Sequence, residues 1–199
     1  MKIIQIGAEA VLIRKKDKLI KNRIPKLYRL KEIDYKIRKS RTRREAKLLS
    51  RLNFVPRLFN FDDQKAEIEM EFIDGKLLRD ILNNMYSKKR KEICKLIGRQ
   101  IYEMHQKGII HGDLTTSNMI LRNNKIYFID FGLGFFSNRI EDKATDIKLL
   151  RQALESKHHT CFNRVYKEIL KEYKDKKVLE WLKDKVEKRG RYKGKKYAI

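Results

Sequence analysis

The chain has 199 residues and a mass of 24.0 kDa, and 41% of its residues are hydrophobic while 38% are charged. This length fits one large domain or two small lobes that share a core, and it excludes repeat arrays and multi-module proteins. Fifty Lys and Arg residues against 26 Asp and Glu give a net charge of +24, which favours a polyanionic partner such as nucleic acid or a nucleotide. The alternative explanation is a lysine-rich proteome or the ion-pair networks of a thermophile.

The two cysteines, Cys94 and Cys161, form neither a CxxC pair nor a metal-binding spacing. A disulfide framework and a zinc site are therefore not expected, and a reducing compartment is. The N-terminal apolar run is too short for a signal peptide, and no stretch of 18 consecutive apolar residues is present. These features predict a cytoplasmic protein without a membrane segment.

Residues 1–73 are predicted to form a small lobe rich in β-strands. Short β-branched or aliphatic runs alternate there with polar turns, and one long charged run has the composition of a helix. The predicted elements are strands at 2–6, 10–14, 18–23, 55–61 and 66–73 and a helix at about 30–52.

Residues 74–199 are predicted to form a second lobe that is mostly helical. In the run 88–107, isoleucines recur every four residues, which is the width of one buried stripe. The dipeptide Asn123-Asn124 tolerates positive φ and therefore predicts a hairpin between 119–121 and 126–129. The expected fold class is α+β, with two lobes that meet at a ligand-binding cleft.

The most informative pattern is His111-Gly-Asp113-Leu-Thr-Thr-Ser-Asn118, which is followed after the hairpin by Asp130-Phe-Gly132. Phosphoryl transfer from ATP requires metal ions that bridge the phosphates, a fixed cation and a group that orients the attacking hydroxyl or water. Because the hairpin folds back beside the loop that precedes it, we expect Asn118 and Asp130 to hold Mg²⁺ through oxygen atoms. Asp113 would orient the nucleophile or accept its proton. Each residue alone more often caps a turn, but the joint pattern is specific.

The fixed cation is expected from the N-terminal lobe. In the predicted helix, Glu45 shares a stripe with Leu48 and Leu49 and so faces inward, where an unpaired carboxylate is costly. Lys21, in the alternating strand 18–23, is the candidate partner and would also contact the α- and β-phosphates of ATP. Arg23 is the rival for this position.

Two further segments are expected to contact the nucleotide because of their position. The turn between the first two strands would cover the phosphates with its backbone groups. The end of the fifth strand would offer backbone groups to adenine, although any strand edge has such groups. The residues assigned to these contacts are Gly7, Ala8 and Glu9 for the phosphates and Met70, Glu71 and Ile73 for adenine.

Taken together, these residues resemble the atypical small protein kinases, and specifically the archaeal-type kinase subunit family of the KEOPS complex, which supports threonylcarbamoyladenosine synthesis on tRNA. The resemblance implies a two-lobed protein-kinase-like fold with a reduced C-terminal lobe, and ATP and Mg²⁺ as cofactors. It also implies a tRNA threonylcarbamoyl transferase subunit and other KEOPS subunits as partners. The matching segments span almost the full chain: residues 5–10, 21, 26–29, 41–49, 111–119, 129–134 and 141–146.

The sequence also departs from ordinary protein kinases. The phosphate-covering loop has one glycine, Gly7, where the kinase pattern has three, and Gly112 replaces the arginine of many catalytic loops. Only residues 133–142 separate Gly132 from the next predicted helix, and no Ala-Pro-Glu follows. A regulated loop and a peptide platform are therefore not expected, and Asp146 is expected to brace the catalytic loop. The resemblance implies an ATP site that serves ATP hydrolysis and limited Ser/Thr phosphorylation.

Basic charge concentrates in residues 14–47, with a net charge of +12, and in residues 183–196, with a net charge of +6. The second run is interpreted as a basic arm that contacts tRNA or a partner, and the alternative is a solvated terminus. The leading hypothesis is a KEOPS-type ATPase or kinase. A free-standing atypical serine/threonine protein kinase is the second, and a pseudoenzyme scaffold is the third; the intact set of five polar site residues argues against the last.

Overall fold

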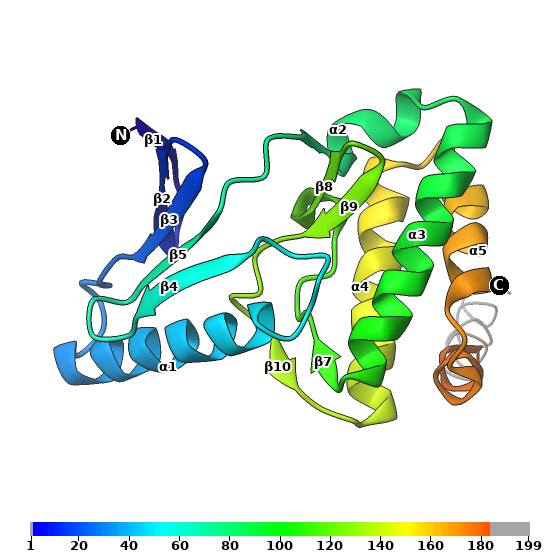
Figure 1. Ribbon diagram of the computed structural model, residues 1–199. Coiled ribbons are helices and arrows are strands. Elements are labelled where there is room, and N and C mark those ends of the chain that lie inside the picture. The colour runs from blue at the N-terminus through cyan, green and yellow to red at the C-terminus, as the bar shows by residue number, and fades with distance from the viewer. Residues whose placement is uncertain (1, 184–199) are drawn as a thin grey trace, which may run out of the picture.

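The computed structural model describes residues 2–183, which form a sheet-rich N-terminal part and a helical C-terminal part (Figure 1). The predicted α+β class, with a small β-rich lobe followed by a helical lobe, is confirmed. The division into 1–73 and 74–199 stays a prediction. The predicted basic arm at 183–196 lies almost entirely outside the described residues.

The N-terminal lobe is an antiparallel five-stranded sheet in the order β1-β2-β3-β5-β4, with one long helix, α1, packed against it. In the register of β3 and β5, Lys21 pairs with Ile68, so these two residues lie side by side in the sheet. The helix buries Ala46, Leu48 and Leu49. Its elements are β1 (Lys2–Ile6), β2 (Ala10–Lys15), β3 (Lys18–Arg23), α1 (Lys31–Leu49), β4 (Leu58–Asp62) and β5 (Glu67–Glu71).

In the N-terminal lobe, the largest differences from the predicted boundaries are in β4, α1 and β5. The strand β4 begins at Leu58 rather than at residue 55, because Pro56 has no backbone N–H to donate to a ladder. The helix α1 ends at Leu49, and the backbone N–H of Ser50 still donates to the carbonyl of Ala46. The strand β5 ends at Glu71, where the chain leaves the sheet toward the second lobe.

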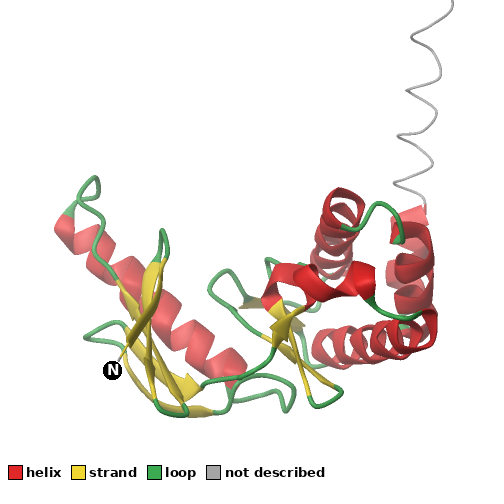
Figure 2. Cartoon of the chain, turned by 90° about the horizontal axis from the view of Figure 1, so that it is seen from above, coloured by secondary structure: helices red, strands yellow, loops and turns green. Residues whose placement is uncertain are grey.

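The C-terminal lobe is built around the helices α3, α4 and α5, which lie on the side of the molecule away from the N-terminal sheet (Figures 1 and 2). The predicted hairpin is present as β8 and β9, and Asn123 and Asn124 both have positive φ, at 49° and 62°. The short strands β6, β7 and β10 were not predicted. The elements are β6 (Lys76–Leu77), α2 (Leu78–Ile81), η1 (Leu82–Asn84), α3 (Ser87–Gln106), β7 (Ile109–Ile110), η2 (Thr116–Asn118), β8 (Met119–Arg122), β9 (Lys125–Phe128), β10 (Phe135–Phe136), α4 (Ile140–Lys157) and α5 (Phe162–Glu172).

One hydrophobic cluster joins the two lobes. It combines Leu48 of α1 and Ile68 of β5 with residues of α3, α4, α5 and the hairpin. Phe54, which follows α1, packs edge to face on Phe128 of β9 with ring centroids 5.5 Å apart, and its carbonyl accepts the N–H of Phe128 at 2.9 Å. The end of α1 is therefore fixed directly to the second lobe.

Cys94 and Cys161 are both buried and free, and burial raises the pKa of the Cys94 thiol to about 12. A thiol in this state is unreactive at neutral pH. Within residues 2–183, no helix combines the length and the apolar character that crossing a bilayer requires.

Candidate active site

Three side chains from distant parts of the chain meet at the junction of the lobes. Lys21 projects from β3, Glu45 from the inner face of α1, and Asp130 follows β9. The Nζ atom of Lys21 donates to Oε1 of Glu45 and to Oδ1 of Asp130, at 2.8 Å in each case. Glu45 is 1% exposed, and the predicted pairing of its carboxylate with the Lys21 ammonium is present. One ammonium thus bridges a buried carboxylate of the first lobe and an aspartate of the second.

The rival cation, Arg23, also binds Glu45. Its Nη2 atom donates to Oε2, so the two carboxylate oxygens of Glu45 are divided between Arg23 and Lys21. Arg23 is 3% exposed, and its Nη1 atom has no hydrogen-bond partner among the described residues. Only Lys21 extends to Asp130, which distinguishes the roles of the two cations. The sequence alone does not distinguish the two cations, because residues two apart in one strand project from the same face.

The charges of this cluster are mutually stabilised. Burial alone would lower the pKa of Lys21, but the Glu45 and Asp130 carboxylates outweigh it and raise that pKa. Burial alone would raise the pKa of Asp130, but the charge of Lys21 and its hydrogen bond outweigh it and lower that pKa. At neutral pH, Lys21 is therefore cationic and Asp130 is anionic.

Asp113 and Asn118 form a second pair in the loop between β7 and β8. The Nδ2 atom of Asn118 donates to the backbone carbonyl of Asp113 at 2.9 Å and to its Oδ2 atom at 2.8 Å. Both bonds use the amide nitrogen, so Oδ1 of Asn118 has no hydrogen-bond partner among residues 2–183 and is available to a cation or a donor. The carbonyl of Asn118 accepts the N–H of Ile129 at 3.0 Å, so this pair is fixed beside the residue that precedes Asp130.

The buried His111 connects the two loops. Its Nδ1 atom accepts the backbone N–H of Asp113 at 3.3 Å, and its Nε2 atom lies 3.1 Å from the carbonyl of Ile129. This pattern assigns the proton to Nε2, in agreement with burial, which lowers the pKa of His111 and favours the neutral ring. The ring also packs on Phe131 at a centroid distance of 4.5 Å. His111 thus sets the spacing between Asp113 and Asp130.

The predicted brace at Asp146 is confirmed. This carboxylate, from α4, accepts the backbone N–H of His111 at 2.6 Å and that of Gly112 at 2.9 Å. His105 is buried and contacts the same carboxylate at 3.3 Å and the hydroxyl of Tyr173 at 2.8 Å, which indicates a structural role. Gly112 has φ of +79°, and an added Cβ would collide with the carbonyl of Leu133. Glycine therefore stands where many catalytic loops have arginine because the backbone leaves no room for a side chain.

A further support of the catalytic loop was missed by sequence reasoning. Thr116, between Asp113 and Asn118, lies 3.0 Å from Nε2 of His158, and Nδ1 of His158 lies 2.7 Å from Oδ1 of Asn83. His158 is fully buried at the end of α4. No local signal in the sequence marks this histidine, because its partners are 42 and 75 residues away.

The turn and the strand assigned to the nucleotide are present, but Ile73 lies beyond the end of β5 rather than within it. The residues Gly7, Ala8 and Glu9 form the turn between β1 and β2, and Glu9 pairs with Arg41 of α1 at 2.7 Å. Met70 and Ile73 are both 5% exposed. The Glu71 side chain is bound by Arg122 at 2.8 Å, and its backbone N–H donates to the carbonyl of Arg57 at 2.8 Å. These contacts with a nucleotide stay predictions.

The oxygen donors of the site are few. No three His, Cys, Asp or Glu side chains of residues 2–183 gather as a metal cluster. The expected ligands are one anionic carboxylate, Asp130, whose side chain is 55% exposed, and the free amide oxygen of Asn118. Mg²⁺ usually takes one or two protein oxygens and completes its shell with water and substrate phosphates. This pair fits a magnesium ion that arrives with a nucleotide, and it does not fit a resident metal centre.

The lysine–glutamate pair, the braced loop and the aspartate after the hairpin are found together in one class of protein. The description "Protein kinase domain" matches residues 14–175 of this chain. A Rio2 kinase from Chaetomium thermophilum, solved in an ADP/Mg²⁺–phosphoaspartate complex, superposes with a TM-score of 0.63 over 96% of this chain and 70% of that one, at 15% identity. The fold is that of a protein kinase, and the chain is an enzyme of the kinase or ATPase type.

Its relatives define the family more narrowly. The KEOPS complex subunit Bud32 of Pyrococcus abyssi is 42% identical over 96% of both chains. A probable bifunctional tRNA threonylcarbamoyladenosine biosynthesis protein of Methanobrevibacter smithii is 41% identical over 96% of this chain, which spans only 36% of that protein's length. The chain belongs to the Bud32 family of protein-kinase-like KEOPS subunits, as the sequence motifs indicated.

Proposed function

We propose that this chain is the ATP-hydrolysing and phosphoryl-transferring subunit of a KEOPS-type complex that supports threonylcarbamoyladenosine modification of tRNA. The observation that carries the proposal is the bridge from Lys21 to both Glu45 and Asp130, at 2.8 Å each. It places a fixed cation beside a candidate metal ligand in a chain whose relatives are named for this tRNA modification.

ATP and Mg²⁺ are the proposed cofactors. The magnesium ion would be held by Asp130 and Asn118 and would neutralise charge on the phosphates. Lys21 orients the α- and β-phosphates, and Glu45 fixes Lys21. Backbone groups of the turn 7–9 and of residues 70–73 bind the phosphates and adenine. In this arrangement the chain contributes positioning and charge rather than covalent chemistry.

Asp113 is the proposed catalytic residue for the nucleophile. Its carboxylate is oriented by Asn118 and lies in a loop that is held by Asp146 and by His158 through Thr116. It would orient water for hydrolysis, or accept the proton of a serine or threonine hydroxyl. Only residues 133–139 separate Gly132 from α4, and two of them pair with β7, so little chain is available to hold a peptide. We therefore propose hydrolysis as the main reaction and Ser/Thr phosphorylation as a limited one.

The proposed partners are a tRNA threonylcarbamoyl transferase subunit, other KEOPS subunits and tRNA. The length of the bifunctional relative supports the first, because this chain matches about a third of a protein whose name assigns it two functions. The net charge of +24 supports contact with tRNA. The buried, free cysteines suit a reducing cytoplasm as the compartment.

The test is ATP turnover by the chain reconstituted with the transferase subunit and a tRNA transcript. Asp130→Asn is expected to lower turnover about 100-fold or more, since an essential charge is removed from the site. Asp80→Asn, an exposed aspartate of α2, is the matched control and should retain wild-type turnover. Turnover that persists in Asp130→Asn would overturn the proposal.

The competing functions have distinct outcomes in the same preparation. Rapid phosphorylation of a casein-like substrate by the isolated chain, without any dependence of ATP turnover on tRNA, would indicate a free-standing serine/threonine kinase. Wild-type tRNA modification supported by Asp113→Asn would indicate a scaffold whose chemistry is dispensable. Modification lost together with ATP turnover in Asp113→Asn is the result that the proposed function requires.

A further inference from the structure

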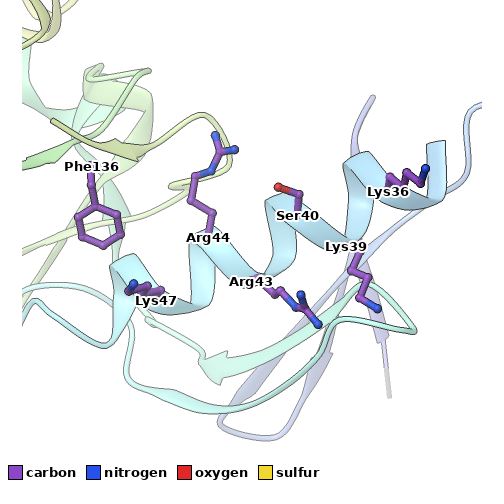
Figure 3. Close-up of a pocket in the computed structure, with 7 residues that line it drawn as sticks. All are labelled: Lys36, Lys39, Ser40, Arg43, Arg44, Lys47 and Phe136. Carbon is purple, nitrogen blue, oxygen red and sulfur yellow. The ribbon is translucent and has the colours of Figure 1, made fainter. Parts of the chain in front are cut away.

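The outer face of α1 carries a row of cations. These cations recur at spacings of three and four residues, so they share one solvent-facing stripe on the side of α1 opposite the buried Glu45. They line an open groove of about 400 Å³, and Phe136 of β10 lies at the end of it that is next to Lys47 (Figure 3). No lining residue is acidic; the lining comprises Lys36, Lys39, Ser40, Arg43, Arg44, Lys47 and Phe136.

The charge of this groove is largely uncompensated. Within residues 2–183, Lys36 and Arg44 are exposed and have no acidic partner, whereas Arg43 pairs with Asp63. A second groove of about 480 Å³ shares Lys47 and Phe136 with the first and adds Arg51 and Lys107. Basic side chains therefore continue from the helix of the first lobe to the end of α3 in the second.

The spacing of the cations suits a nucleic-acid strand. Five cations are distributed between Lys36 and Lys47, a length of about 16 Å at 1.5 Å per residue. A single RNA strand laid along this length presents several phosphates, so more than one of the cations can contact its backbone at the same time.

Phe136 adds a contact that a purely electrostatic surface lacks. Its side chain is 44% exposed, and the Lys47 ammonium lies 5.4 Å from the centre of its ring. An exposed aromatic ring at the end of a basic groove is a stacking platform for an unpaired base. An acidic peptide would neutralise the cations but would have no comparable use for the ring.

We propose that the groove formed by the α1 cations and Phe136, called here the α1 groove, binds a single strand of RNA, with phosphates along the helix and one base on Phe136. This inference rests on the proposed function, because it names the surface through which the chain contacts tRNA. The surface is separate from Lys21, Glu45 and Asp130, so it can fail while the proposed ATP chemistry holds.

The location gives the bound strand contacts with both lobes. The strand β10 pairs with β7, and β7 leads directly into His111 and the catalytic loop. An added Cβ on Gly134 would lie 2.7 Å from Cδ1 of Leu48, which shows how closely the segment before β10 approaches α1. RNA in the α1 groove therefore lies across the junction between the helix that carries Glu45 and the segment that follows Asp130.

The test is fluorescence anisotropy with the full 199-residue chain and a fluorescein-labelled ten-nucleotide oligouridine. The variant Lys36→Glu/Arg44→Glu should bind at least tenfold more weakly than its control, Lys88→Glu/Lys91→Glu, which changes net charge equally on exposed lysines of α3. Two lost phosphate contacts should also reduce the slope of log K against log salt by about 1.4. Phe136→Ala should weaken binding about 5- to 10-fold, at the lower end of base-stacking effects.

Every other outcome opposes the proposal. An equal loss of RNA affinity in the α1-groove variant and the α3 control would mean that the RNA is attracted by the net charge alone. Unchanged affinity in both variants would exclude this surface as an RNA site. If a decaglutamate peptide binds as tightly as the oligouridine and Phe136→Ala has no effect, the surface takes acidic protein rather than RNA. ATP turnover without RNA should be the same in the α1-groove variant and the wild type, which separates a failure here from a failure of the catalytic site.

Discussion

Glu45→Gln tests the buried charge cluster most directly. The carboxylate is 1% exposed and balances two buried cations, Lys21 and Arg23, through one oxygen each. Glutamine keeps the shape but offers one acceptor and no charge. Lys21 retains Asp130 as a partner, whereas Arg23 loses its only ion pair within the described residues.

The expected loss of stability in Glu45→Gln follows from this arrangement of charges. Removing one member of a buried ion pair destabilises a protein by about 3–5 kcal/mol, because the other charge stays buried and unpaired. For a chain of this size, 1 kcal/mol shifts the melting temperature by about 2–4 °C, so Glu45→Gln should melt roughly 6–20 °C below the wild type. Asp130 does not reduce this cost much, because its half-exposed carboxylate is screened by solvent and does not reach Arg23.

Urea unfolding followed by the fluorescence of the single tryptophan, Trp181, measures the change. Glu92→Gln, on an exposed position of α3, is the control and should change the free energy of unfolding by less than about 0.5 kcal/mol. Adding Arg23→Gln to Glu45→Gln should restore about 1–3 kcal/mol, since the unpaired cation is also removed. A Glu45→Gln protein within about 1 kcal/mol of the wild type, or a double variant without recovery, would refute the reasoning.

Three further predictions follow from the site. Lys21→Met should lower ATP turnover about 100-fold or more, while Arg23→Lys should stay within about tenfold of the wild type; equal losses in a steady-state assay would contradict the distinct roles of the two cations. Gly112→Ala should destabilise the chain by about 2 kcal/mol or more in urea, because a left-handed residue costs about 1–2 kcal/mol before the collision with Leu133 is added; unchanged stability would exclude that strain. Burial lowers the pKa of His158 below its ordinary 6.5, so the unfolded chain binds a proton at a higher pH than the folded chain does. The stability that the neutral, buried ring contributes is therefore present above pH 6.5 and is lost as the pH falls, by at most about 1.4 kcal/mol per pH unit. Unfolding at pH 7.5, 6.5 and 5.5 should show a smaller slope for His158→Gln, and an identical slope would count against the buried neutral ring.

Much of the small lobe was predictable because its signals are local. The strands at 2–6 and 18–23 have the predicted bounds, and the Asn123-Asn124 turn is where two positive-φ residues were needed. Glu45 was assigned an inward direction from helical spacing alone, and its burial agrees.

The features that could not be predicted from the sequence depend on contacts between segments that are distant in the chain. The strands β7 and β10 have two residues each, and they exist only because the chain brings 109–110 beside 135–136. The shared use of Glu45 by Arg23 and Lys21 requires knowing where two side chains of one strand point once β3 lies on α1. Spacing could propose either cation as the partner, but it could not show that the carboxylate binds both.

The division of Glu45 between two cations has a consequence for control of the enzyme. In the proposed reaction the Lys21 ammonium would turn toward phosphate while Arg23 still neutralises the Glu45 carboxylate, so α1 would keep this ion pair with and without nucleotide. An outward movement of α1 that inactivated the enzyme would leave the buried Arg23 without its carboxylate partner. Regulation of such a protein would then act on the access of nucleotide to the site rather than on the position of this helix.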